Sequence, residues 1–144
     1  GEEISELMTQ KIKFQVVPGI TAASGVSAYA GIPLTHRDYS QSCIFITGHE
    51  KNGKLNINWS NLIHENQTIV IYMGLNSLSI IVHNLIDSGM RKNMPIALVQ
   101  EGTTEKQKVM VSTISKVISK TLKSDIQSPV IIIIGEVVKL RKTI

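Results

Sequence analysis

Three short glycine-containing segments carry the residue types in this sequence that could hold a small molecule. Each follows a run of residues typical of a β-strand: Pro18-Gly19-Ile20-Thr21-Ala22, Tyr72-Met73-Gly74 and Glu101-Gly102-Thr103. Ligands of α/β sheets bind beyond the carboxyl ends of strands, and a glycine there lets a ligand reach the backbone. Ordinary turns use the same residues, so these segments alone leave both a small-molecule cleft and simple turn chemistry open.

Other catalytic and metal-binding patterns are absent from the sequence. The four histidines lie far apart without metal-ligand spacing and are predicted to be surface or loop residues: His36, His49, His64 and His83. His36-Arg37-Asp38 matches a kinase triplet, but no glycine-rich loop or Asp-Phe-Gly accompanies it, so we interpret the match as chance. A nucleophile elbow, a P-loop and a dinucleotide fingerprint are also missing. We therefore predict no metal site.

Composition limits the class of protein. The 144 residues suffice for one domain, or one domain plus part of another, and 42% hydrophobic with 18% charged residues is typical of a globular chain. Only 4% of residues are aromatic, which disfavours a platform for stacking single-stranded nucleic acid. The single cysteine, Cys43, excludes an internal disulfide and suits a reducing compartment. The sequence shows no signal peptide, and its longest apolar run, at 130–134, is too short to span a bilayer.

Charge is distributed unevenly along the chain. Residues 1–90 carry five basic and seven acidic side chains, a net charge of −2, whereas residues 91–144 carry ten and four, a net charge of +6. A solvated basic surface, a polyanionic substrate and a nucleic acid all remain open interpretations, because charge alone does not separate them.

The hydrophobic pattern predicts an α/β fold with a mixed sheet of about five strands flanked by helices. Two adjacent strands near the C-terminus predict a hairpin, and Asn76 and Thr113 are expected to cap the helices that follow them. Residues 1–17 form one helix and one strand before a Pro-Gly break, as if they were the tail of a preceding domain, and residues 18–144 form the domain itself. Helices are expected over 2–10, 21–29, 76–88 and 113–122; strands over 14–17, 43–47, 68–73, 95–100, 106–112 and 129–134; and a polar connector over 50–61.

Six motifs in a fixed order make the chain resemble the uroporphyrinogen-III C-methyltransferases of the tetrapyrrole methylase family, most closely the methylase module of siroheme synthases. The resemblance covers essentially the whole chain. Its motifs are Val16-Val17-Pro18-Gly19-Ile20-Thr21-Ala22-Ala23-Ser24-Gly25, Gly31-Ile32-Pro33-Leu34-Thr35-His36-Arg37-Asp38-Tyr39, Thr47-Gly48-His49, Tyr72-Met73-Gly74-Leu75, Glu101-Gly102-Thr103 and Ser128-Pro129.

The resemblance implies a cytoplasmic, homodimeric enzyme of two α/β domains with S-adenosylmethionine in the cleft between them. It implies methylation of uroporphyrinogen III at C2 and C7, giving precorrin-2 by way of precorrin-1, with neither nucleic acid nor membrane as partner. By motif, Thr21, Ala22, Met73 and Gly102 resemble the residues that line the cofactor. Arg37, and after it His36, are the residues we would expect to bind substrate carboxylates; a loop arginine in a surface ion pair is the alternative.

The chain departs from the family in its missing cofactor loops. A complete module is longer, opens with a Gly-x-Gly-Pro-Gly-Asp loop and carries a Gly-Gly-Asp-Pro loop, and neither occurs here. The acid–base residues of the family belong to that part, so we expect a C-terminal portion that supplies one wall of the cleft, holds no catalytic residue and is inactive alone. The alternatives are a related methylase with another precorrin or a ribosomal RNA base as substrate, and a basic module that binds nucleic acid.

Overall fold

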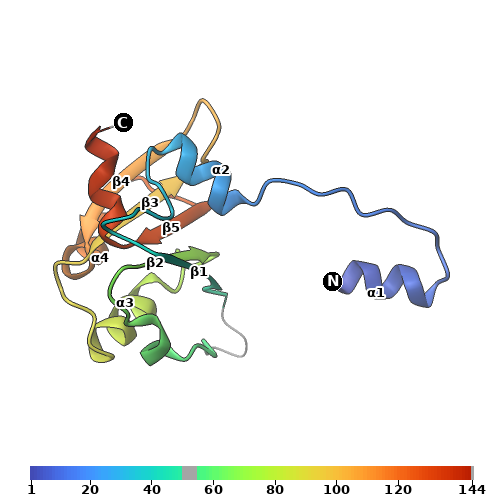
Figure 1. Cartoon of the computed structure of the whole chain (residues 1–144), viewed down its shortest axis with the longest axis horizontal. Coiled ribbons are helices and arrows are strands. Elements are labelled where there is room, and N and C mark those ends of the chain that lie inside the picture. The colour runs from blue at the N-terminus through green and yellow to red at the C-terminus, as the bar shows by residue number, and fades with distance from the viewer. Residues whose placement is uncertain (50–54, 144) are drawn as a thin grey trace.

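The computed structural model describes residues 1–49 and 55–143. It contains a mixed five-stranded sheet with helices on both faces (Figure 1), which confirms the predicted fold class. The strands are β1 (Ser42–Thr47), β2 (Gln67–Tyr72), β3 (Pro95–Gln100), β4 (Lys108–Thr113) and β5 (Val130–Ile134). The helices are α1 (Glu2–Thr9), α2 (Ala22–Tyr29), α3 (Leu78–Asp87), α4 (Ile114–Leu122) and the 3-10 helices η1 (Trp59–Leu62) and η2 (Glu136–Thr143). Residues 50–54 of the predicted connector lie outside the described residues.

The order of the strands brings several strand ends to one edge of the sheet. The order is β1-β2-β5-β3-β4, with β1 parallel to β2 and with β5 antiparallel to both β2 and β3. β3 and β4 form the predicted antiparallel hairpin. The carboxyl ends of β1, β2 and β3 therefore meet at the same edge as the beginning of β5, which is where a ligand of an α/β sheet is expected.

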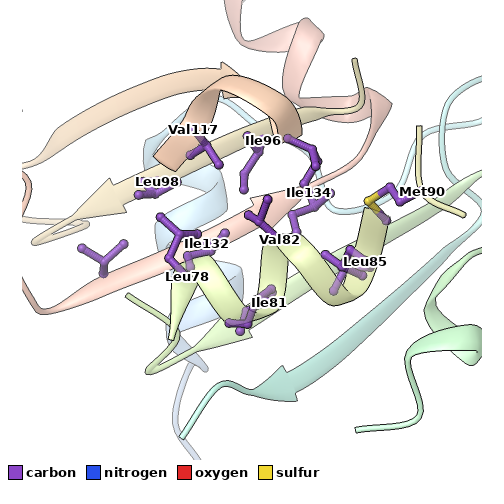
Figure 2. Close-up of a cluster of buried hydrophobic side chains, with 14 of the residues drawn as sticks. Leu78, Ile81, Val82, Leu85, Met90, Ile96, Leu98, Val117, Ile132 and Ile134 are labelled. Atoms are coloured by element: carbon purple, nitrogen blue, oxygen red, sulfur yellow. The ribbon is translucent and has the colours of Figure 1, made fainter. Parts of the chain in front are cut away.

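The three central strands are buried on both faces because their side chains alternate between two apolar layers. One layer joins β2, β3 and β5 to α3 and α4; Figure 2 shows Ile96, Leu98, Ile132 and Ile134 facing Leu78, Ile81, Val82 and Leu85. The other layer joins Val70, Ala97, Val99, Ile131 and Ile133 to α2 and η2. Each buried isoleucine stabilises the fold by about 1.5–3 kcal/mol relative to an exposed one, so these layers hold the strand ends in place.

The two ends of α3 show where local sequence signals succeed and fail. The helix ends within one residue of its predicted end at residue 88, and Gly89 follows with φ +107°. The Gly89 N–H donates to the Ile86 carbonyl at 2.9 Å, and the Met90 N–H donates to the Leu85 carbonyl at 2.9 Å. The predicted cap at Asn76 is wrong, because the helix begins one residue later with Ser77 in the N-cap position. Asn76 instead lines the cavity described below.

The first twenty residues stand apart from the sheet. Figure 1 shows α1 separated from the rest of the chain by an extended segment, and none of the residues of α1 is buried. The strand predicted at Phe14–Val17 is wrong: the segment is exposed and joins no described strand. Its β-branched residues favour extended backbone, but a strand also needs a partner for its hydrogen bonds. The domain boundary at residue 17 stays a prediction.

Hydrogen exchange across a dilution series tests whether another chain covers this exposed segment. Amides of residues 1–17 are expected to exchange fast in dilute solution and more slowly as concentration rises, because the exposed apolar side chains of Phe14, Val16 and Val17 gain a cover when chains associate. Amides of β5 serve as the control and should stay protected throughout. Strong protection of residues 1–17 at every concentration would contradict the proposed boundary.

Among the described residues, none of the helices combines the length and the apolar character required to cross a bilayer.

Candidate functional site

A cavity of about 780 Å³ lies at the edge of the sheet where the carboxyl ends of β2 and β3 flank the beginning of β5. Its volume is within the range of small-molecule sites. α2 contributes one wall through Ala22 and Val26. The lining residues are Ala22, Val26, His49, Tyr72, Met73, Leu75, Asn76, Val99, Glu101, Gly102, Thr104, Ser128, Pro129, Val130 and Ile131.

The backbone is strained where β2 and β3 end at this cavity. Met73 has φ +53° and Glu101 has φ +45°, both in the left-handed region that side-chain-bearing residues rarely adopt. Such a conformation costs about 1–3 kcal/mol and concentrates at ligand sites. The Met73 side chain is 64% exposed although it is large and apolar. The two strands therefore turn sharply at the cavity and present Met73 to it.

The beginning of α2 is held against the end of β2 by hydrogen bonds. The Tyr72 hydroxyl accepts the N–H of Ala23 at 2.9 Å and forms a second hydrogen bond with the hydroxyl of Thr21. Ala22 lies between these two residues and lines the cavity. The structure thus brings Thr21 and Ala22, two of the residues expected from the resemblance, close to Met73, the third.

Packing against α2 requires a glycine at position 102, which also lines the cavity. A Cβ atom at Gly102 would overlap the Val26 side chain of α2, meeting its Cγ1 at 2.9 Å and its Cβ at 3.0 Å. The sequence suggested that this glycine lets a ligand approach the backbone, but the position of the missing Cβ is already taken by α2. Gly102 therefore allows α2 to sit close to the end of β3.

A substitution at Gly102 tests this packing. Gly102→Ala is expected to lower the free energy of unfolding by about 1–3 kcal/mol, because the added methyl overpacks the contact with Val26. Chemical denaturation should show a smaller cost for the same change in a Val26→Ala background, where both Cγ methyl groups that the added methyl meets are absent. An equal cost in both backgrounds would contradict the contact.

A buried glutamine orients the carboxylate at the cavity. Gln100 is 7% exposed, and its Nε2 donates to the Glu101 Oε1 at 3.0 Å. Its Oε1 accepts the N–H of Gln127 at 2.8 Å, which ties the segment before β5 to the end of β3. Glu101 therefore contributes a held negative charge to a lining that is otherwise mostly apolar.

The two residues predicted to bind substrate lie outside this lining. His36 sits in a tight loop, where its N–H donates to the Ser40 carbonyl at 2.7 Å and its Nδ1 accepts the N–H of Asp38 at 3.1 Å. Arg37 is exposed. The structure brings Thr21, Ala22, Met73 and Gly102 together at the cavity and leaves His36 and Arg37 apart from it; the roles of all six stay predictions.

Tyr72, Asn76 and Glu101 were not singled out as site residues from the sequence. Tyr72 offered a signal, because a tyrosine at the end of a buried strand needs a partner for its hydroxyl. Nothing in the sequence identified that partner, which lies 49 residues away. Within 1–49 and 55–143, no three His, Cys, Asp or Glu side chains are grouped closely enough to hold a metal ion.

Comparison with known proteins places these features in a family. The family model for tetrapyrrole (corrin/porphyrin) methylases matches residues 1–118. The chain is 59% identical over 142 residues to the siroheme synthase of Acinetobacter baylyi and 53% identical to that of Methylobacillus flagellatus. Both matches extend over 99% of this chain. It spans 31% and 30% of the length of these two curated relatives.

Solved structures agree with this assignment. The uroporphyrin-III C-methyltransferase of Thermus thermophilus, determined in complex with S-adenosylhomocysteine, superposes with a TM-score of 0.80 at 26% identity, over 96% of this chain and 60% of that one. A cobalt precorrin-4 methyltransferase shares the fold with a TM-score of 0.83 at 20% identity, over 95% of this chain and 58% of that one. The match to the family model over most of the sequence and these two lines of similarity show that the chain belongs to the tetrapyrrole methylase family.

Proposed function

We propose that this chain is the C-terminal part of an S-adenosylmethionine-dependent uroporphyrinogen-III C-methyltransferase. Residues 18–144 form its C-terminal domain, and residues 1–17 are the tail of the N-terminal domain. The observation that carries the proposal is that Ala22, Met73 and Gly102, chosen by motif alone, line one cavity, with Thr21 bonded at its margin. The similarity to a methyltransferase whose structure contains S-adenosylhomocysteine supports it.

The residues at the cavity fit S-adenosylmethionine chemically. The apolar side chains of Val26, Leu75 and Ile131 suit an adenine ring, and the Asn76 amide can hydrogen-bond its polar edge. Met73 offers a pliable apolar contact. The Glu101 carboxylate complements a cofactor that carries positive charge on its sulfonium and ammonium groups.

The proposed reaction methylates uroporphyrinogen III at C2 and then C7, with precorrin-1 as intermediate and precorrin-2 as product. When bound, S-adenosylmethionine supplies a methyl group that its sulfonium already activates. This chain holds the cofactor from one side, excludes water with its apolar lining and so orients the methyl toward the substrate. Arg37 and His36 are proposed to bind substrate carboxylates. The base that removes the ring proton is proposed to belong to the remaining part of the enzyme, a cytoplasmic homodimer.

A variant that neutralises the Glu101 charge is expected to affect the affinities for S-adenosylmethionine and S-adenosylhomocysteine differently. Glu101→Gln in the complete methylase, expressed from its full reading frame, is expected to weaken S-adenosylmethionine binding about tenfold and S-adenosylhomocysteine binding by a smaller factor, because the product lacks the sulfonium charge. Calorimetry measures both affinities. Glu105→Gln, an exposed carboxylate outside the lining, is the control and should change neither. Equal loss for both ligands would contradict a contact with the sulfonium charge.

A turnover assay of the complete methylase tests the proposed function. Transfer of a labelled methyl group to uroporphyrinogen III, with two additions per molecule, is the expected result. Transfer only to a later precorrin or to ribosomal RNA would assign a related methylase instead. Absence of methyl transfer combined with nucleic-acid affinity that falls steeply with salt would favour the basic binding module.

A further inference from the structure

Tyr72 caps helix α2, whose own N-cap residue leaves the first backbone N–H groups without a side-chain hydrogen bond. α2 has only eight residues and contains one glycine and two serines, so its intrinsic stability is low. Thr21 occupies its N-cap position but makes no side-chain hydrogen bond to the helix, and its hydroxyl is instead bonded to Tyr72. The free N–H of Ala23, in the first turn, donates to the Tyr72 hydroxyl at 2.9 Å. The cap of α2 therefore comes from the end of β2.

The residues that precede α2 do not position its beginning, because they are exposed. The segment before α2 is exposed throughout residues 11–20, and Ile20, the residue directly before Thr21, is 86% exposed. The beginning of α2 is thus approached by a segment that packs against none of the described core. Ala23 and Val26 pack the inner face of α2 into the apolar layer. The hydrogen bonds to Tyr72 add the directional contacts that fix Thr21 and Ala22 at the cavity.

The Tyr72 ring is itself well placed to act as an anchor. It ends a strand in which residues 68–71 are buried, and it packs against the apolar layer under α2. Phe45 of the neighbouring strand β1 meets it edge to face, with ring centroids 6.3 Å apart at 69°. The hydroxyl is therefore held by a rigid sheet rather than by a loop.

We infer that Tyr72 is a positioning residue that fixes the beginning of α2 against the end of β2 and thereby sets the cofactor wall of the cavity. Its hydroxyl holds Thr21 and Ala22, and its own peptide carries Met73, so one residue sets the relative placement of three predicted cofactor contacts. Loss of the hydroxyl would let α2 shift, and a small misplacement of a binding group costs affinity steeply. This inference rests on the proposed function.

Tyr72→Phe removes the hydroxyl and keeps the ring. In this chain, hydrogen exchange at the Ala23 amide is expected to accelerate about tenfold, while amides of β5 keep their protection. In the complete methylase, the dissociation constant of S-adenosylhomocysteine and the KM for S-adenosylmethionine are expected to rise about tenfold, equivalent to about 1.4 kcal/mol, with kcat little changed. Tyr29→Phe, at the exposed far end of α2, is the matched control and should change none of these quantities.

A second variant keeps the inference testable if Tyr72→Phe lowers stability. Thr21→Val removes the other hydroxyl; it should also accelerate exchange at Ala23, and in a Tyr72→Phe background it should weaken cofactor binding less than it does in the wild type. An unchanged dissociation constant in Tyr72→Phe would overturn the inference, as would weaker binding without faster exchange at Ala23. If the wild-type complete methylase itself fails to bind S-adenosylhomocysteine, the proposed function fails instead.

Discussion

This chain alone is expected to bind S-adenosylhomocysteine at least about a hundredfold more weakly than the complete methylase does, a difference of about 2.8 kcal/mol. The cavity is walled by α2 and by the ends of β2, β3 and β5, and under the proposed function the glycine-rich cofactor loops lie elsewhere in the enzyme. A ligand in contact with one wall loses the hydrogen bonds and apolar contacts of the other.

Calorimetry on both proteins under the same conditions measures this difference. The complete methylase serves as the control, because it shows that the ligand preparation and buffer support binding. Low-micromolar or tighter binding by this chain alone would contradict the idea that the remaining loops supply needed contacts, and would make these 144 residues a sufficient cofactor site.

Met73→Ala in the complete methylase is expected to weaken cofactor binding about tenfold while changing the free energy of unfolding by no more than about 0.5 kcal/mol. The Met73 side chain lines the cavity and is largely exposed, so its removal leaves no hole in the core. The substitution keeps Cβ, so the strain of the positive φ angle is unchanged.

Met110→Ala is the matched control for this second prediction. Met110 lies in β4 and is 8% exposed within the layer that contains α3 and α4. Its truncation is expected to cost about 2–5 kcal/mol of stability and to leave the affinity of the folded protein unchanged. If Met73→Ala behaves like Met110→Ala, with lower stability and intact affinity, Met73 is a packing residue and its proposed role is wrong.

Features set by local pattern could be predicted from the sequence. The strands at 68–73 and 129–134 could be predicted because each is an apolar run rich in β-branched residues, and the end of α3 could be predicted because Gly89 suits left-handed backbone. The hairpin of β3 and β4 was equally readable, since its two strands are neighbours in the chain. These elements position the strand ends that form the cavity.

Features set by distant partners could not be predicted. Phe14–Val17 has the residues of a strand, but the described part of the chain pairs it with nothing. The hydrogen bond from the Ala23 N–H to the Tyr72 hydroxyl joins residues 49 positions apart, and the hydrophobic pattern of the sequence does not indicate such a contact. The glycine at position 102 could be explained by the approach of a ligand or by close packing of a helix, and only the position of Val26 in the structure shows the packing.

A nuclear magnetic resonance titration of the isotope-labelled chain with S-adenosylhomocysteine tests most directly that this cavity is the cofactor site, because weak binding is still visible residue by residue. The expected result is that signals of Ala22, Met73 and Gly102 shift with ligand concentration, while those of a separate cavity of about 460 Å³ lined by Gly89 and Arg91 stay in place. Shifts confined to that second cavity, with Ala22, Met73 and Gly102 unmoved at millimolar ligand, would contradict the account.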